Sequence, residues 1–506
     1  METQLVNRYA VNMHGVLSCY DRILITGTLP GACYAAGMTS FLYSLGVRIF
    51  DYAQFAEPLR DRVRTRAQEV CAGAGLEIEH VSKSHIRKEE LVQRVLVTRG
   101  DAPGLVHVIS AMEACPSYRP WHDKATGKTY LRGDTGKCLH YYFYFIDKDL
   151  GLCYLRVPTW APFRLQFYFN GHGALRAAMR KRGIEARMLD NGFTHVADWL
   201  QAQQLAERLR PEVLHKKLDR YARLFCPPIA LFDSGYHWSL MQVEYATDIV
   251  FGRQQELAPI YEALVRTAVH AVKAENVATF LGRKLYGQYR DELGNDFQTR
   301  IQGTRIKHHM GKAAIKMYDK HGLILRIETT VNDVSFFKHH RRVEHRDGTW
   351  EMKTAPLKKS IYSLPALVDL MRAANRRYLE FISTLDDPSA ALKDLEKLAA
   401  AVREGERSLR GFNLFAGDDL DVFQALLRGE FNISGFQNRD LAQRLQKAGR
   451  QVSLLLKRLC CHGLIKKIGH CYKYYLTALG RRVAATAARL HEMTIIPSLS
   501  AAHACA

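Results

Sequence analysis

Two short stretches of the sequence place lysine, tyrosine, arginine and glutamate at alternating positions. The first contains Lys316, Tyr318 and Lys320, and the second contains Arg326 and Glu328. In two strands joined at the intervening His-Gly, alternation puts each set on one face of a hairpin. Lysines position a phosphate and a carboxylate holds a divalent cation, so the pair predicts a site for a phosphodiester and for Mg²⁺ or Mn²⁺. The alternative for Glu328 is an ion pair with Arg326 or Lys316.

The spacing K-x-Y-x-K followed by R-x-E resembles a strand pair in the rolling-circle replication initiators of phages and plasmids. The resemblance implies a divalent metal and a tyrosine that nicks one DNA strand. The chain departs from many such enzymes in one respect, because none of its 21 histidines forms a His-x-His pair.

Tyr378 is the candidate nucleophile, in an Asn-Arg-Arg-Tyr segment of a predicted helix. The two arginines would stabilise the phosphate that the tyrosine attacks. The alternative is that Tyr378 packs with Met371 and Phe381 on the apolar face of that helix.

Three further carboxylates form a second candidate metal site: Asp233, Glu244 and Asp248. The segment 238–281 predicts a helix, on which Glu244 and Asp248 share a face because they are four residues apart. Asp233 precedes that helix, and together the three acids would hold Mg²⁺ or Mn²⁺ for hydrolysis. The alternative is that they pair with arginines.

The positive charge of the chain is concentrated in two zones. The chain has 72 Lys and Arg against 51 Asp and Glu, a formal net charge of +21. Residues 305–377 contain 16 Lys and Arg against 7 acids, and residues 421–482 contain 12 against 3, a net of +9 in each zone. Such zones attract a polyanion, and Arg305 and Lys307 belong to the first as candidate nucleic-acid contacts.

The second zone predicts a winged helix-turn-helix domain over residues 418–490. Helices are expected at 439–445 and 451–461, followed by a hairpin over 464–476 and a last helix from residue 478. The segment resembles the winged-helix domain of MarR-type bacterial regulators, which implies that its second helix enters a DNA major groove. Candidate contacts on that helix are Arg450, Gln451, Ser453, Lys457 and Arg458, and those on the wing are Lys466, Lys467, His470 and Lys473. The alternative is a winged helix used only for protein contacts.

The rest of the chain predicts a multidomain α/β and α+β protein. Strands at 22–26, 47–50, 76–81 and 105–109 alternate with helices, which predicts a largely parallel α/β layer with Asp21 and Glu113 at its sheet ends. An antiparallel aromatic sheet with helices follows. No internal repeat is visible. The predicted divisions are 1–118, 119–230, 231–403 with the basic strand pair, a linker at 404–417, the winged helix, and a tail at 491–506.

The composition excludes several classes of protein. The apolar runs are far shorter than the roughly 20 residues of a membrane-spanning helix, and the first residues have no signal-peptide pattern. Eleven cysteines without a Cys-x-x-Cys pair argue against a disulfide framework and against a zinc site, and favour the cytoplasm.

These observations predict a nucleic-acid-binding protein, associated with mobile DNA, that processes DNA or binds a specific DNA site. Any enzymatic activity would be a metal-dependent nicking or nuclease reaction. Two alternatives stay open: a non-enzymatic regulator whose large front part senses a signal or forms a homodimer, and an RNA-binding or RNA-guided effector. The whole chain also resembles a family of bacterial proteins labelled as regulators because of their winged helix.

Overall fold

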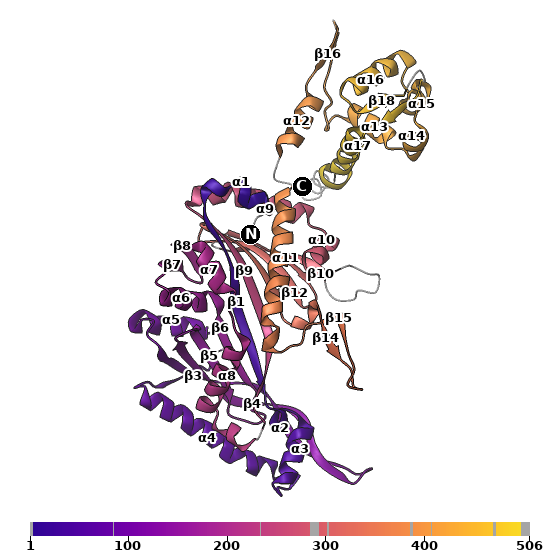
Figure 1. Cartoon of the computed structure of the whole chain (residues 1–506). Helices are drawn as coiled ribbons and strands as arrows, with labels where there is room; N and C mark the ends of the chain where they lie inside the picture. Colours follow the sequence, from indigo (N-terminus) through magenta and orange to yellow (C-terminus); the bar gives the residue numbers. More distant parts are fainter. Residues whose placement is uncertain are drawn as a thin grey trace. The chain divides into compact units, whose positions relative to one another are not determined.

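The chain forms two compact units, Met1–Asp386 and Asp387–Ala506 (Figure 1). The computed structural model describes residues 4–83, 85–232, 234–283, 293–300, 303–384, 388–405, 407–468 and 472–496. Each unit is treated by itself below.

The first unit is built on one sheet of eleven strands. Every neighbouring pair is antiparallel except β2 with β3, and the spatial order is β10-β11-β12-β13-β9-β1-β6-β5-β4-β3-β2. The strands are β1 (Met13–Thr28), β2 (Ile78–His80), β3 (Gly104–Asp123), β4 (Lys128–Asp147), β5 (Gly151–Pro158), β6 (Leu165–Asn170), β9 (His237–Phe251), β10 (Leu293–Arg300), β11 (Gly303–Met310), β12 (Ala313–Lys320) and β13 (Ile324–Val331).

The topology of this sheet repeats, although the sequence shows no repeat. In each half a long strand, β1 or β9, is followed by helices and then by a four-stranded antiparallel run, β3 to β6 or β10 to β13. The last strand of each run returns beside the first strand of its half, and β1 and β9 pair antiparallel at the centre. The sheet therefore consists of two similarly wound halves joined through their first strands.

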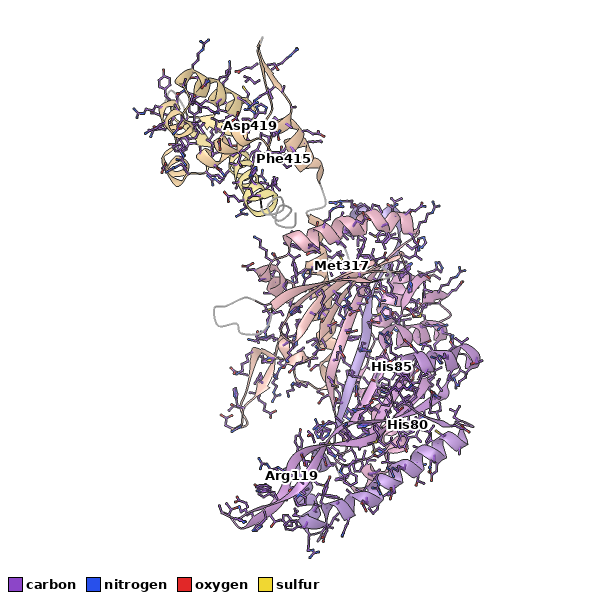
Figure 2. All side chains as sticks on the ribbon, turned by 180° about the vertical axis from the view of Figure 1, so that it is seen from behind. His80, His85, Arg119, Met317, Phe415 and Asp419 are labelled. Atoms are coloured by element: carbon purple, nitrogen blue, oxygen red, sulfur yellow. The ribbon has the colours of Figure 1, made fainter. Side chains whose placement is uncertain are left out.

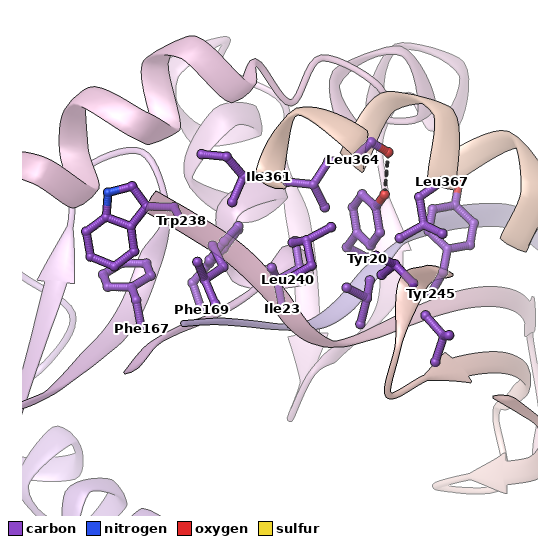
Figure 3. Packing of buried hydrophobic residues seen from close by; sticks show 14 of the residues in the cluster. Tyr20, Ile23, Phe167, Phe169, Trp238, Leu240, Tyr245, Ile361, Leu364 and Leu367 are labelled. Carbon is purple, nitrogen blue, oxygen red and sulfur yellow. Dashed lines mark hydrogen bonds between the residues drawn. The ribbon is translucent and has the colours of Figure 1, made fainter. Parts of the chain in front are cut away.

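Helices cover one face of the sheet and bury its largest apolar cluster. Tyr20 and Ile23 of β1, Phe169 of β6 and Tyr245 of β9 lie in this cluster, and the Tyr20 hydroxyl donates a hydrogen bond of 2.6 Å to the Leu364 carbonyl (Figure 3). The helices that contact this face are α3 (Ala35–Ser44), α4 (Tyr52–Gly73), α8 (Pro211–Phe225), α9 (Gln254–Ala271), α10 (Ala274–Phe280) and α11 (Leu364–Thr384). Two short helices, α1 (Gln4–Arg8) and α2 (Pro30–Cys33), complete this layer.

The opposite face is covered only in part. Helices pack against it through two small apolar clusters, one beside β1 and one beside β3. The covering elements are α5 (Lys88–Arg99), α6 (Gly171–Lys181), β7 (Ala186–Leu189), β8 (Gly192–Val196) and α7 (Trp199–Ala206). Polar side chains of β1, β9, β12 and β13 gather on this face, which we call the polar face.

Two of the secondary-structure predictions were wrong. The N-terminal layer is not a parallel α/β sheet, because only β2 and β3 pair in parallel and the expected strand at 47–50 is a 3₁₀ turn, Ile49–Asp51. The expected helix at 238–281 begins as strand β9, and helices start only at Gln254. The second half of β9 is buried on both faces, so its sequence lacks the alternation that identifies a strand.

The predicted hairpin of residues 316–328 is confirmed. Lys316 pairs with Glu328 and Tyr318 with Arg326 across β12 and β13. His321 and Gly322 at its turn have φ of 59° and 70°, the left-handed conformation of the turns that match strand twist.

The sequence predicted several domains within the first 386 residues, but a single sheet runs through all of them. Strand β3 runs through residue 118, and β1 pairs along its length with β9 from a different predicted domain. Within the described residues, no helix is long and apolar enough to cross a bilayer.

A buried carboxylate, Asp147, fastens the β4–β5 turn to α8. It accepts hydrogen bonds from Lys217 Nζ at 2.9 Å, from the Tyr221 hydroxyl and from the backbone N–H groups of Asp149 and Leu150. Burial alone would raise the pKa of Asp147, but Tyr221 and Lys217 lower it.

The variant Asp147→Asn is expected to lower the free energy of unfolding by about 1.5–3 kcal/mol at pH 7, the contribution of hydrogen bonds to a charged group. Because the folded pKa lies below the unfolded value of about 3.9, this contribution is complete above that pH and is lost as the pH falls further. Urea unfolding of both proteins at pH 7 and near pH 3 measures the difference. A difference that widens in acid would contradict the assignment.

The second unit contains the order of elements that the sequence predicted for its C-terminal part. Helices α15 and α16 are joined by a turn, and the pair β18–β19 and helix α17 follow. The elements are α12 (Pro388–Ala399), β16 (Val402–Glu404), β17 (Arg407–Leu409), α13 (Gly417–Leu426), α14 (Gly429–Ser434), α15 (Asn438–Leu445), α16 (Gly449–Cys461), β18 (Ile465–Lys467), β19 (Tyr474–Leu476), α17 (Ala478–Leu490) and a π-helical turn (His491–Ile495).

The expected linker 404–417 is part of the folded unit. Phe412 is buried in the core of the second unit, and the carbonyls of Arg410 and Gly411 accept hydrogen bonds from Arg458 of α16.

Candidate functional site

Three carboxylates from three strands meet on the polar face. Asp21 comes from β1, Glu244 from β9 and Glu328 from β13, and one oxygen of each lies within 4.8 Å of the others. An octahedral ion with bonds of 2.1 Å separates adjacent ligand atoms by about 3.0 Å and opposite ones by about 4.2 Å, so the three oxygens would approach one another somewhat on binding. Carboxylate oxygens are ligands that Mg²⁺ and Mn²⁺ prefer, so the donor set fits either ion. We call these three residues the carboxylate cluster.

A bulge in β1 brings Asp21 into the cluster. The register of β1 against β9 shifts between Tyr20 and Ile23, so Asp21 and Arg22 together lie opposite Glu244. Tyr20 and Ile23 both belong to the helix-covered core, and the extra residue lets Asp21 turn to the polar face between them.

Two side chains of β12 hold Glu328 in place. Lys316 Nζ lies 2.6 Å from Glu328 Oε1 and 3.3 Å from Glu244 Oε1, and the Tyr318 hydroxyl donates to Glu328 Oε2 at 2.7 Å. Burial lowers the pKa of Lys316, but the two carboxylates outweigh it and the net pKa is raised. The lysine is therefore charged and partly neutralises the cluster.

Burial and the neighbouring Glu328 raise the pKa of Glu244. Asp21 behaves in the opposite way: burial raises its pKa, but Arg326 and His172 hold the net value well below the usual range. Asp21 is thus an anion under all ordinary conditions. The charged form of Glu244, in contrast, is disfavoured by the acid beside it.

A fully buried arginine links the cluster to the body of the sheet. Arg326 donates to both oxygens of Asp248 at 2.6 and 2.7 Å, and its third nitrogen lies 3.4 Å from Asp21. His172 lies between the two acids, 3.2 Å from Asp21 and 3.3 Å from Asp248. Asn191 donates to Asp21 and accepts from Lys320. These contacts fix the position of Asp21.

A polar pocket of about 420 Å³ adjoins the cluster and is lined by Glu244 and by Lys316, the partner of Glu328. Lys307 and His309 of β11 and the exposed Lys312 of the β11–β12 turn also line it. The pocket is large enough for one nucleotide unit, and its lysines carry the charge that a phosphate requires.

The structure brings together only part of the predicted metal sites. Glu328 and Glu244, which the sequence assigned to different sites, share one cluster, and Asp21 completes it. Asp248 belongs to the pair with Arg326 and not to a metal site, because both of its oxygens are used there. Asp233 lies outside the described residues.

Tyr378 is not an accessible nucleophile. It is fully buried on the helix-covered side, where its hydroxyl lies 3.1 Å from His308 Nε2 and its ring packs edge-on against Phe280. Burial raises the pKa of Tyr378 well above its ordinary value, which opposes the deprotonation that nucleophilic attack needs. The helical spacing with Met371 indicated core packing, and core packing is what the structure shows.

The predicted phosphate contacts of the first basic zone divide into two groups. Arg326 and Lys320 are buried in the network around Asp21 and cannot meet a nucleic acid in this state. Lys316, Tyr318 and Lys307 are half-buried and line or border the cluster and its pocket, and Arg305 is half-buried on the same strand as Lys307.

Most of the predicted contacts of the second unit are exposed. Arg450, Gln451 and Lys457 of α16 are exposed, and Lys457 pairs with Glu404 at 3.1 Å. The Ser453 hydroxyl is exposed but engaged, since it accepts from Asn438 and donates to the Gly449 carbonyl. On the wing Lys466, Lys467 and Lys473 are exposed, whereas His470 lies outside the described residues.

Arg458 is not a DNA contact. It is buried, its guanidinium bonds both oxygens of Asp419 at 2.8 and 3.0 Å, and it lies 3.7 Å from the ring centroid of Phe412. It was predicted as a contact from residue type, but the helix buries Arg458 and exposes the apolar Leu454.

Comparison with known protein families, with curated proteins and with solved structures finds no significant match to the chain.

Proposed function

We propose that the protein is a DNA-processing protein of the kind associated with mobile DNA, which cleaves a phosphodiester at the carboxylate cluster and binds duplex DNA through its C-terminal unit. The observation that carries the proposal is the cluster of Asp21, Glu244 and Glu328 beside a lysine-lined pocket. Acids and lysines at one place suit a metal-dependent reaction on a phosphate.

The residues around the cluster have separate tasks in this proposal. A divalent cation bound by the three carboxylates would supply Lewis-acid stabilisation of the phosphate and an activated water. Lys316 exchanges its carboxylate partners for a phosphate oxygen, Tyr318 keeps Glu328 oriented, and Lys307 and Lys312 hold the neighbouring phosphates. Water is the nucleophile, because the tyrosine predicted for that role is buried.

Mn²⁺ titration followed by electron paramagnetic resonance tests the site, and relaxation of supercoiled plasmid with Mg²⁺ or Mn²⁺ tests the reaction. We expect one bound Mn²⁺ and nicking that EDTA stops. Absence of both would refute the enzymatic half of the proposal.

A second function is favoured by one contact. Lys316 already bridges Glu328 and Glu244, and a permanent bridge of this kind would make the cluster a structural ion network in a non-enzymatic DNA-binding regulator. Site-specific duplex binding without metal binding or nicking would support this alternative. An abundant RNA copurifying with the protein would instead support an RNA-binding role.

Duplex binding by the second unit gives a separate prediction. The variant Arg450→Ala is expected to weaken binding to the preferred duplex by about tenfold to a hundredfold, the range for an arginine that contacts a base edge. Fluorescence anisotropy measures it, with Arg403→Ala, an exposed arginine of β16, as the matched control. Equal DNA affinities of the two variants would show that α16 is not part of the DNA interface.

A further inference from the structure

Two β-hairpins of the first unit project beyond the helices (Figure 1). Both carry exposed cationic and aromatic side chains. The first is the outer part of β3–β4, residues 119–132, where these strands pair only with each other. The second is β14–β15, with β14 (Lys338–Glu344) and β15 (Trp350–Pro356) forming a separate two-stranded sheet. We call them the first and second arm.

Both arms are positively charged. The first has four Lys and Arg against one acid, and the second has five against three with three histidines in addition. Two of the three acids of the second arm are tied within it, since Glu351 pairs with His345 and Lys353 and Asp347 caps the turn at Thr349. Lys338 and Arg342 of β14 are exposed, and neither forms an ion pair among the residues that the structure describes.

Each arm also holds a tryptophan against arginine. Trp121 is 39 % exposed, and the guanidinium carbons of Arg119 and Arg132 lie 5.6 and 5.2 Å from its ring centroid. Figure 2 shows Arg119 on this arm. Trp350 is 55 % exposed with Arg342 at 4.4 Å. These are the only exposed tryptophans among the five of the chain. An exposed tryptophan beside arginine recurs on two separate hairpins, and exposed apolar rings of this kind are typical of ligand-binding surfaces.

We infer that the two arms grip duplex DNA. A two-stranded ribbon fits the major groove, which is about 12 Å wide. Its cations would contact phosphates on both sides, and the tryptophans would offer apolar surface to the sugars. The inference takes DNA as the polyanion from the proposed function but does not require a metal at the carboxylate cluster.

Salt-dependent binding of the full-length protein to a duplex of unrelated sequence tests the arms. The variant pairs are Lys338→Ala with Arg342→Ala for the second arm and Lys124→Ala with Lys128→Ala for the first. Each pair is expected to weaken binding and to reduce the slope of log K against log salt by about 2, one unit for each lost phosphate contact. The control pair Arg62→Ala with Arg182→Ala removes two exposed arginines elsewhere and is expected to leave the slope unchanged.

Tryptophan fluorescence gives a second readout. Duplex is expected to protect the protein from acrylamide quenching, and this protection is expected to be lost in the double variant Trp121→Phe with Trp350→Phe. Unchanged slopes in both arm variants, or tighter binding to a single strand than to the duplex, would overturn the inference. If the protein nicks DNA but the slopes are unchanged, only the inference about the arms is refuted. If the protein binds no DNA, the proposed function is refuted as well.

Discussion

Replacing Glu328 with glutamine is expected to reduce Mn²⁺ affinity by at least about 100-fold and to remove plasmid nicking, because a charged metal ligand is lost while its volume is kept. Glu328 is the central member of the cluster, since it contacts both Lys316 and Tyr318. Electron paramagnetic resonance of Mn²⁺ and a plasmid relaxation assay measure the two effects.

Tyr318→Phe is the matched control for this variant. It keeps all three carboxylates and removes only the hydroxyl that orients Glu328, so a smaller loss of Mn²⁺ affinity is expected, about 10-fold to 100-fold. Asp248→Asn in turn should leave the number of bound Mn²⁺ ions unchanged, since Asp248 is paired with Arg326. Undiminished nicking by Glu328→Gln would exclude the cluster as the catalytic centre.

Replacing Arg326 with methionine is expected to lower the free energy of unfolding of the first unit by about 3–5 kcal/mol, because it leaves two buried acids without their cation. Arg326 is fully buried and joins Asp248, Asp21 and His172. Urea unfolding followed by circular dichroism measures the change.

The double variant Arg326→Met with Asp248→Leu separates lost charge from lost packing. If the cost comes from uncompensated charge, removing Asp248 as well is expected to restore part of the stability, since buried ion pairs replaced by apolar groups are often neutral. Additive losses in the double variant would show instead that shape is decisive at this position.

Local pattern was sufficient for the part of the site that lies within one hairpin. Lys316, Tyr318 and Glu328 could be placed on one face because alternation and the His-Gly turn determine the register of β12 and β13. The same reasoning could not place Asp21 in the site. Asp21 and Glu113 were predicted at the ends of a sheet, but each lies in the middle of a strand, β1 and β3. The partners of Asp21 in the cluster, Glu244 and Glu328, come from strands more than 200 residues away in sequence. A bulge, and not strand alternation, turns its side chain toward them.

Two wrong assignments have one cause. Tyr378 and Arg458 were assigned chemical roles from residue type, but both are held in cores by partners that come from other elements, His308 for Tyr378 and Asp419 for Arg458. A polar group inside a core must be paired, and the pairing partner is invisible until the chain is folded. The second arm escaped notice because its cations were counted only as part of a charged zone, and the first because its residues lie outside both zones.

The winding of the sheet determines the order in which the first unit is completed during synthesis. Strand β1 is made first but lies at the centre, with β6 on one side and β9 on the other. After residue 170 has been added, the ribosome needs roughly 4 to 16 s to reach residue 251, at about 5–20 residues per second. For that time the edge of β1 that β9 will occupy has no partner from the same chain, and an open edge is a template for aggregation. A nascent chain that stalls in this interval would be a substrate for chaperones, and a gene fragment that ends before β9 would yield insoluble protein.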